Sequence, residues 1–147
     1  MRPILAGLEI DLAQILRDTT RIAVVGLSPK PERPSYQVAS YLHTAGYEII
    51  PVNPGHDQIL GRRCYPNLES IPGRIDLVNI FRKPHEVPAL VDSAIHLGVK
   101  VLWMQLGIIH EEAAATATAA GLVVIMNRCL KIDHQNYSRG AENCYGT

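Results

Sequence analysis

The stretch Ile22-Ala-Val-Val-Gly26-Leu-Ser-Pro-Lys30 indicates how this chain folds. Four apolar, mostly β-branched residues run directly into a glycine, and a segment with helical periodicity follows a few residues later. Short, continuous apolar runs of this kind are typical of parallel strands that helices cover on both faces. The stretch therefore predicts the first strand, the first turn and the first helix entry of an α/β domain.

Four more apolar runs follow at a spacing of about 25 residues, the length of a strand with its crossover helix. They are Glu48–Val52, Asp76–Phe81, Val99–Met104 and Leu122–Met126. This alternation predicts an α/β fold with a Rossmann-like, doubly wound sheet of about five parallel strands and helices on both faces. With 147 residues we expect one domain, whose core lies at about residues 20–132.

The segments between the strands have the apolar spacing and end signals of helices. Ser35 is expected to be the N-cap of a helix that stops at Gly46, and Gly98 and Gly121 are expected to end two later helices. Further predicted elements are a helix at about Ile10–Arg17 packed on the sheet edge, an irregular connection over His56–Ile75 with a short helix near Asn67–Ser70, and a polar, partly disordered tail from Lys131, mainly residues 133–147.

Composition excludes several classes of partner and site. Fourteen basic residues balance fourteen acidic ones, so the net charge of zero gives no reason to expect nucleic acid or an anionic membrane. Cys64, Cys129 and Cys144 are odd in number and form no CxxC pair, and the N-terminus does not have the pattern of a secretory signal. We expect a cytoplasmic protein with no disulfide framework, and the scattered histidines predict no metal site.

Candidate binding residues follow the predicted strands, because ligands of open parallel sheets bind beyond the carboxyl ends of the strands. Gly26 removes a side chain where the backbone must approach a ligand, and the helix start near Ser35 offers N–H groups to an anion. Asn53 stands where a common NAD site has Asp or Glu for the ribose hydroxyls, which argues against NAD. The missing carboxylate instead indicates a more phosphorylated ligand, and with zero net charge any anion site must be local.

Two basic pairs, Lys30 with Arg33 and Arg82 with Lys83, are predicted to meet at this edge. Taken singly, such a pair is usually a solvated surface, but the coincidence of positions suggests a ligand with several phosphates. Trp103 and Gln105 close the fourth strand with Gly107 behind them, and they could border an adenine or a pantetheine arm; a lone tryptophan is more often part of a core. No GxSxG, P-loop or HExxH motif is present, which favours a binding protein over an enzyme.

As a set, five motifs resemble the small stand-alone CoA-binding proteins, which are similar to the N-terminal CoA-binding domain of the succinyl-CoA synthetase α subunit. The motifs are Val24-Val-Gly-Leu-Ser28 with Lys30 and Arg33-Pro-Ser35, then Pro51-Val-Asn-Pro54, Asp76-Leu-Val-Asn-Ile-Phe-Arg82, Trp103-Met-Gln-Leu-Gly107 and Met126-Asn-Arg-Cys129. The resemblance extends from about Ile22 to Ile132. It implies a Rossmann-like sheet that binds coenzyme A at its C-terminal rim.

The resemblance also implies a role for each matching position. Nucleotide phosphates would contact Gly26, Leu27, Ser28 and Lys30, with Arg33, Ser35 and Tyr36 at the helix entry. Adenosine would contact Val52, Asn53 and Pro54; the adenine or 3′-phosphate would contact Phe81, Arg82 and Lys83; and pantetheine would contact Trp103, Gln105 and Gly107. The synthetase reaction needs a phosphohistidine from another domain and a partner subunit, so the resemblance does not imply ligase activity.

Three functional hypotheses follow. The first is a protein that binds CoA or an acyl-CoA without catalytic machinery. The second is an NADP-dependent oxidoreductase, since basic residues could also contact a 2′-phosphate. The third is a CoA-responsive regulatory or partner protein, in which Cys129 could form a mixed disulfide with CoA; a buried, inert cysteine is the more common alternative at such a position. A protein partner or a homo-oligomer is compatible with each of them.

Overall fold

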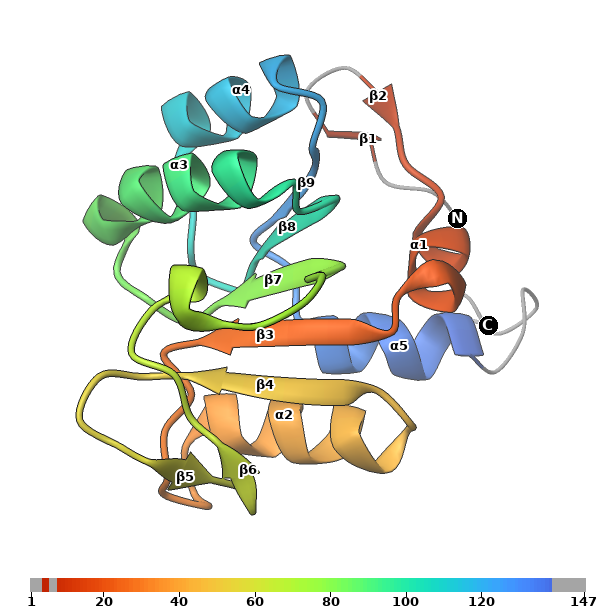
Figure 1. The fold of residues 1–147 in the computed structure, drawn as a ribbon. Coiled ribbons are helices and arrows are strands. Elements are labelled where there is room, and N and C mark those ends of the chain that lie inside the picture. Colours follow the sequence, from red (N-terminus) through yellow and green to blue (C-terminus); the bar gives the residue numbers. More distant parts are fainter. Residues whose placement is uncertain (1–3, 6–7, 139–147) are drawn as a thin grey trace.

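The computed structural model describes residues 4–5 and 8–138, and the predicted parallel sheet forms its centre (Figure 1). Five parallel strands pair in the order β4-β3-β7-β8-β9. Each overlaps one of the five apolar runs, so the predicted α/β architecture is confirmed. Their bounds are β3 Arg21–Val25, β4 Glu48–Val52, β7 Leu77–Ile80, β8 Val101–Met104 and β9 Val123–Met126.

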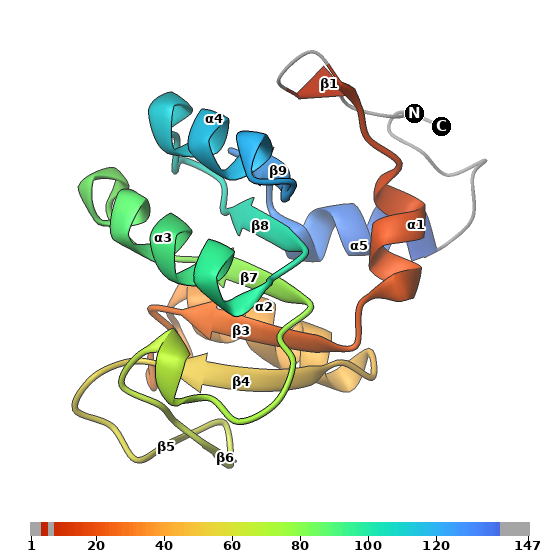
Figure 2. The ribbon, with the colours of Figure 1, turned by 45° about the horizontal axis from the view of Figure 1, so that its top comes forward.

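Helices cover both faces of this sheet, as expected for a doubly wound fold (Figures 1 and 2). Helices α3 and α4 lie on one face, and α2 and α5 lie on the other. The short helix α1 contacts α5, where the sequence predicted a position at the sheet edge. The helices are α1 Leu12–Asp18, α2 Pro34–Thr44, α3 Val87–Leu97, α4 Glu111–Ala119 and α5 Leu130–Ser138.

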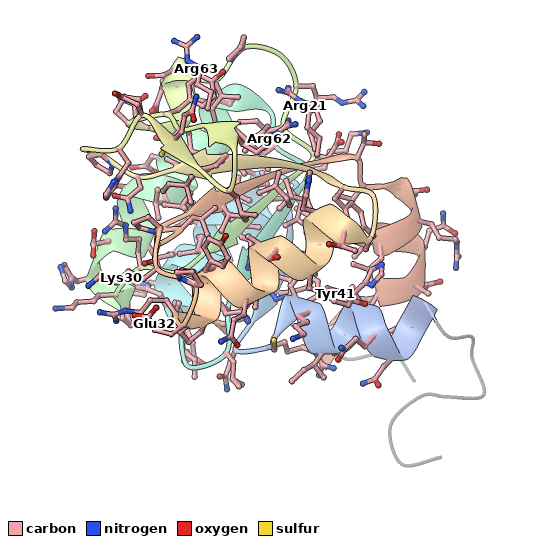
Figure 3. The ribbon with its side chains drawn as sticks, turned by 90° about the horizontal axis from the view of Figure 1, so that it is seen from below. Arg21, Lys30, Glu32, Tyr41, Arg62 and Arg63 are labelled. Carbon is pink, nitrogen blue, oxygen red and sulfur yellow. The ribbon has the colours of Figure 1, made fainter. Side chains whose placement is uncertain are left out.

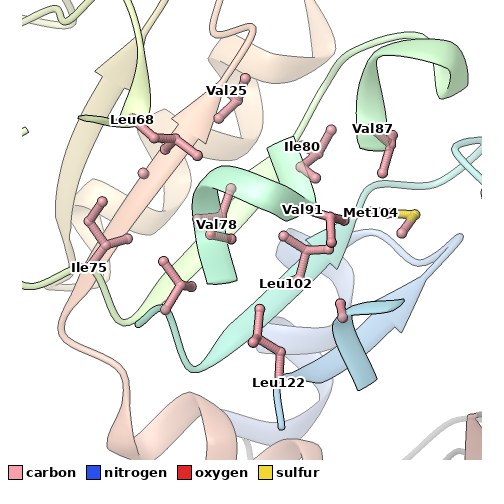
Figure 4. Packing of buried hydrophobic residues seen from close by; sticks show 14 of the residues in the cluster. Val25, Leu68, Ile75, Val78, Ile80, Val87, Val91, Leu102, Met104 and Leu122 are labelled. Atoms are coloured by element: carbon pink, nitrogen blue, oxygen red, sulfur yellow. The ribbon is translucent and has the colours of Figure 1, made fainter. Parts of the chain in front are cut away.

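Alternate residues of the central strands supply two separate cores. On the face of α3 and α4, Val78 and Leu102 pack with Val87 and Val91 of α3 (Figure 4). On the opposite face, Trp103 packs among residues of α1, α2 and α5. Burying a leucine-sized side chain contributes about 1.5–3 kcal/mol. Both cores therefore hold the strand ends in fixed positions.

Short elements complete the fold. β1 (Ile4–Leu5) pairs with β2 (Leu8–Glu9), and β5 (Gln58–Ile59) pairs with β6 (Arg62–Arg63) within the connection that the sequence predicted to be irregular. The 3-10 helix η1 (Leu68–Ser70) is capped by the side chain of Asn67, as its sequence predicts. A second 3-10 helix, η2 (Pro84–Glu86), leads into α3.

Helix α5 corrects the prediction for the end of the chain. The region from Lys131 was expected to be polar and partly disordered, yet residues 130–138 form a helix. Leu130 and Asp133 are buried, and Asp133 accepts two hydrogen bonds of 2.7 Å from the Arg128 guanidinium. A buried leucine and a paired carboxylate on one face explain why this polar segment is ordered. The remaining tail positions, 139–147, lie outside the described residues.

The strand order fixes where a ligand would bind. After β3 the chain adds β4 on one side and β7 on the other, so the order reverses at β3 and β7. Open α/β sheets bind ligands beyond the carboxyl ends of the strands at such a reversal.

Among the described helices, none is long and apolar enough to cross a membrane.

Candidate functional site

Gly26 and Phe81 meet at the point of reversal. Gly26 has φ +86°, and a Cβ at this position would lie 2.3 Å from the main-chain oxygen of Phe81. The glycine is therefore required by the close approach of two loops of the protein itself. The sequence pattern predicted a glycine that makes room for a ligand, so the structure gives a different cause for the same residue.

The loop after Gly26 is held by hydroxyl groups. The Ser28 N–H donates to Oγ of Ser35 at 3.0 Å, and the Lys30 N–H donates to Oγ of Ser28 at 3.1 Å. Ser35 is thus not the N-cap that the sequence predicted: Arg33 occupies that position, Pro34 is the first helical residue, and no side chain caps the helix.

Side chains of this loop point in different directions. Leu27 is fully buried, and the partly buried Tyr36 packs against the same core. Lys30 and Arg33 are exposed on the way into α2 (Figure 3 labels Lys30). The predicted phosphate contact of Leu27 could therefore come only from its backbone, whereas both cations are accessible.

Asn53 braces this loop from the neighbouring strand. It follows β4, and its Nδ2 donates to the main-chain oxygen of Leu27 at 2.9 Å. An aspartate here would place a carboxylate against a carbonyl oxygen. The neutral amide that argued against NAD therefore also has a structural role within the protein.

A cleft of about 820 Å³ opens at the rim between α2 and α5; we call it the rim cleft. The ends of β7 and β8 contribute to it, and it combines an apolar wall with polar and cationic groups. Its lining residues are Pro34, Gln37, Val38, Phe81, Arg82, Lys83, Pro84, Gln105, Leu106, Ile108, Cys129, Lys131, Ile132 and Gln135.

Electrostatics favour an anion in the rim cleft. Arg82, Lys83 and Lys131 line it, and its described lining contains no Asp or Glu. One of the two basic pairs expected at this edge therefore lies in the cleft, and the other lies on the loop before Pro34. In a protein with zero net charge, this is a local excess of positive charge.

Gln105 is a buried polar group in the lining, with only 6% of its surface exposed. Its Oε1 accepts from the Leu130 N–H at 3.3 Å and from Nδ2 of Asn79 at 3.2 Å. Because a backbone N–H can only donate, the amide has one possible orientation. Its Nε2 donors have no hydrogen-bond partner among the described residues.

Two other predicted residues lie outside the rim cleft. Trp103 has 0% exposure and donates from Nε1 to the main-chain oxygen of Arg128 at 2.8 Å, so it is a core residue that positions the chain before α5. This corrects the expectation that its ring flanks pantetheine. The Gly107 N–H donates to Oδ1 of Asn127 at 2.7 Å, which links the loops after β8 and β9.

A second cleft of about 310 Å³ lies on the α3 side of the rim, and we call it the second cleft. Val52 and Pro54, two of the residues expected to contact adenosine, contribute to its wall. Arg82 lines both clefts and so stands between them. Unlike the rim cleft, the second cleft contains two carboxylates, those of Glu69 and Glu86.

The two described cysteines differ in their surroundings. Cys64 is buried, its Sγ lies 3.4 Å from the main-chain oxygen of Asn53, and burial raises the pKa of its thiol. Cys129 is partly exposed and lines the rim cleft. No group of three or more His, Cys, Asp or Glu side chains that could hold a metal ion exists in the described part of the chain.

The wall that α5 provides was not predicted from the sequence. Lys131, Ile132 and Gln135 lie in a segment that was expected to be partly disordered, yet all three line the rim cleft. Leu130 and Asp133 are buried and three residues apart. That helical spacing was the available signal, but the polar composition of the segment obscured it.

Comparisons with known proteins agree with this geometry. A CoA binding domain family model matches residues 20–135. The uncharacterized protein YneT of Bacillus subtilis is 41% identical over 126 residues, which is 86% of this chain and 93% of YneT. A solved structure of a hypothetical protein from Pyrococcus horikoshii has a TM-score of 0.87 and 39% identity, covering 94% of this chain and 98% of that one.

The chain also matches one part of a larger enzyme. An ADP-forming acetate–CoA ligase II of Archaeoglobus fulgidus is 32% identical over 81 residues, which is 54% of this chain and 12% of the ligase. The match to the family model covers most of the chain, including the strand ends that form both clefts. The protein therefore belongs to the CoA-binding domain family.

Proposed function

We propose that this protein binds coenzyme A, free or as an acyl thioester, at the rim of its sheet, and that it has no catalytic machinery of its own. The observation that carries the proposal is the rim cleft at the strand-order reversal, which the described residues line with three cations and no carboxylate. CoA bears a diphosphate and a 3′-phosphate, and charge-assisted hydrogen bonds to phosphate are among the stronger polar contacts of proteins.

The phosphates fit best where Arg82 and Lys83 approach the start of α2. Pro34, the first residue of this helix, lines the same cleft, and no side chain caps the helix. Exposed N–H groups at a helix start favour anions. Lys30 and Arg33, on the loop before the helix, add mobile positive charge beside this position.

The two ends of CoA would then lie in different clefts. The second cleft offers Val52, Pro54 and Leu90 to the neutral adenine base, while Glu69 and Glu86 disfavour phosphate there. In the rim cleft, the unpaired Nε2 donors of Gln105 suit an amide oxygen of the pantetheine arm. Of the residues that the resemblance assigned to adenosine, Val52 and Pro54 line the second cleft and Asn53 does not; of those assigned to pantetheine, Gln105 lines the rim cleft and Trp103 and Gly107 do not.

The absence of catalysis is part of the proposal. The chain spans about 12% of the A. fulgidus ligase that it matches. A match to so small a part of the ligase does not support the ligase's own activity for this chain, and no GxSxG, P-loop or HExxH motif is present. We therefore expect binding of acetyl-CoA without formation of ATP when ADP and phosphate are added.

Titration calorimetry of the full chain with CoA, acetyl-CoA, NADP, NAD and ATP tests the proposal. Saturable heat with CoA or acetyl-CoA, and much weaker heat with the other three nucleotides, is the expected result. No heat with CoA or acetyl-CoA at millimolar concentration, together with saturation by NADP, would instead support the oxidoreductase hypothesis. A luminescent assay for ATP tests the predicted lack of turnover.

A further inference from the structure

The rim cleft contains a thiol as well as cations. Cys129 lies immediately before α5 and lines the rim cleft. Arg82 and Lys83, on the loop after β7, line the same cleft. It is a free cysteine and only partly buried. A ligand whose phosphates contact those cations could therefore extend along the cleft toward a sulfur atom.

Gln105 independently indicates what this part of the cleft binds. Its acceptor is used by the Leu130 N–H, the first amide of α5 and the one next to Cys129 in the chain. Its two Nε2 protons lack an acceptor among the described residues, although the side chain is more than nine-tenths buried. The Nε2 group is not among the fully buried atoms that lack a partner, so it is open to the cleft that Gln105 lines, where the carbonyl oxygen of a ligand would accept its hydrogen bond. The pantetheine arm carries amide carbonyls and ends in a thiol.

Cys129 is also the more accessible of the two described thiols. It is partly exposed and lines the rim cleft, as Lys131 does. Cys64 provides the opposite case within the same molecule, because it is buried in the core, away from this cleft. The two thiols should therefore differ strongly in reactivity.

We propose that Cys129 captures CoA as a mixed disulfide by exchange with CoA disulfide; this rests on the proposed binding of CoA at the rim. The Cys129 thiolate attacks one sulfur of CoA disulfide, a new bond joins Cys129 to that sulfur, and the original S–S bond breaks. The second CoA leaves as a thiolate and takes a proton from water. Cys129 is oxidised, the departing CoA is reduced, and CoA disulfide is the oxidant.

The test compares two disulfides on one protein. Full-length C144S, which retains Cys64 and Cys129, is incubated with CoA disulfide or with glutathione disulfide and followed by intact mass and peptide mapping. We expect the CoA adduct on Cys129 to form at least about ten-fold faster than the glutathione adduct, because binding at the rim raises the local concentration of the reacting sulfur. Excess desulfo-CoA should slow formation of the CoA adduct because it competes for the rim cleft, and dithiothreitol should remove the adduct.

Two variants examine the roles of the residues. C129S in the same background should form no adduct. Gln105→Glu keeps an acceptor for the Leu130 N–H but loses the Nε2 donors, so it should reduce the preference for CoA disulfide over glutathione disulfide. Equal rates with the two disulfides, or an adduct on Cys64, would overturn the proposal.

Calorimetry separates the two ways of failing. If CoA binds C144S but CoA disulfide leaves Cys129 unmodified, the thiol proposal is wrong and the binding proposal stands. If CoA does not bind C144S, the proposed function itself is wrong.

Discussion

The side-chain nitrogen of Asn53 lies 2.9 Å from the main-chain oxygen of Leu27, so the residue after β4 holds the loop after β3. In Asn53→Asp, this donor becomes an acceptor, and two oxygens face each other. We expect the free energy of unfolding to fall by about 1–3 kcal/mol and CoA affinity to fall as well. Urea unfolding and calorimetry measure the two effects.

Asn136→Asp is the matched control for the added charge, since Asn136 lies on α5 and lines neither cleft. If this control weakens CoA binding as much as Asn53→Asp does, the effect comes from the added charge and not from loss of the hydrogen bond between Asn53 and Leu27.

Gly26→Ala should lower the free energy of unfolding by more than the cost of placing an alanine in a left-handed backbone conformation. Gly55 has a similar φ of +89°, but a Cβ added there would meet nothing within 4 Å, so Gly55→Ala isolates the backbone cost. We expect about 1 kcal/mol for Gly55→Ala and at least about 2 kcal/mol more for Gly26→Ala, because its Cβ meets the Phe81 carbonyl. Equal losses in chemical denaturation would contradict that contact.

Arg82→Ala and Lys30→Ala should each weaken CoA binding by about 1.5–3 kcal/mol if both side chains contact phosphate. Dephospho-CoA separates them, because a side chain that contacts the 3′-phosphate loses its mutational effect with this analogue. Arg63→Ala is the control: this exposed arginine lies over the Tyr65 ring and lines neither cleft. Unchanged affinity in both rim variants would disprove the phosphate placement.

Asp76 should contribute stability that acid removes. Burial alone would raise the pKa of Asp76, but hydrogen bonds from the Arg21 and Thr20 N–H groups, with Arg74 nearby, outweigh it and lower the pKa. The contribution is therefore present above the unfolded pKa of about 3.9 and is lost as the pH falls through the lower folded value.

For Asp76→Ala we expect a loss of about 2–4 kcal/mol at pH 7, because two part-buried N–H groups lose their acceptor. Asp92→Ala, at an exposed position of α3, should change little. Urea unfolding from pH 7 to pH 2.5 checks both expectations, and a constant difference between wild type and Asp76→Ala over this range would contradict the titration.

His134 should have the opposite dependence. It lies between α5 and α2, with its Nδ1 2.7 Å from the Tyr41 hydroxyl, and burial lowers its pKa. As the pH falls below about 6.5, the unfolded chain gains this proton before the folded one, so stability declines until the folded pKa is reached. His134→Gln should reduce the loss of stability between pH 7.5 and 5.5, whereas His96→Gln, at an exposed site, should not.

The strands could be predicted because their apolar runs are unambiguous, and parallel pairing then places Asn53, Arg82 and Gln105 at one edge. What the sequence could not indicate was which of these side chains reach a cleft. Trp103 and Gln105 are two residues apart at the end of one strand, yet one is sealed in the core and the other reaches the rim cleft.

Contacts between residues of different elements explain the other differences between the sequence predictions and the structure. The hydroxyl of Ser35 was expected to cap a helix, but it bonds a distant loop because Pro34 already begins the helix. Helix α5 depends on the burial of Leu130 and on the Arg128–Asp133 pair, neither of which local composition reveals. Whether the predicted site residues bind CoA stays a prediction for calorimetry to test.

Arg82 lines both the rim cleft and the second cleft, so the charge on the two sides of this side chain differs. An anion that draws this guanidinium toward α5 leaves Glu69 and Glu86 with less counter-charge across the wall, and the α3 side then repels negative groups more strongly. An elongated ligand with a neutral head and an anionic middle would consequently enter in one direction and not in the reverse.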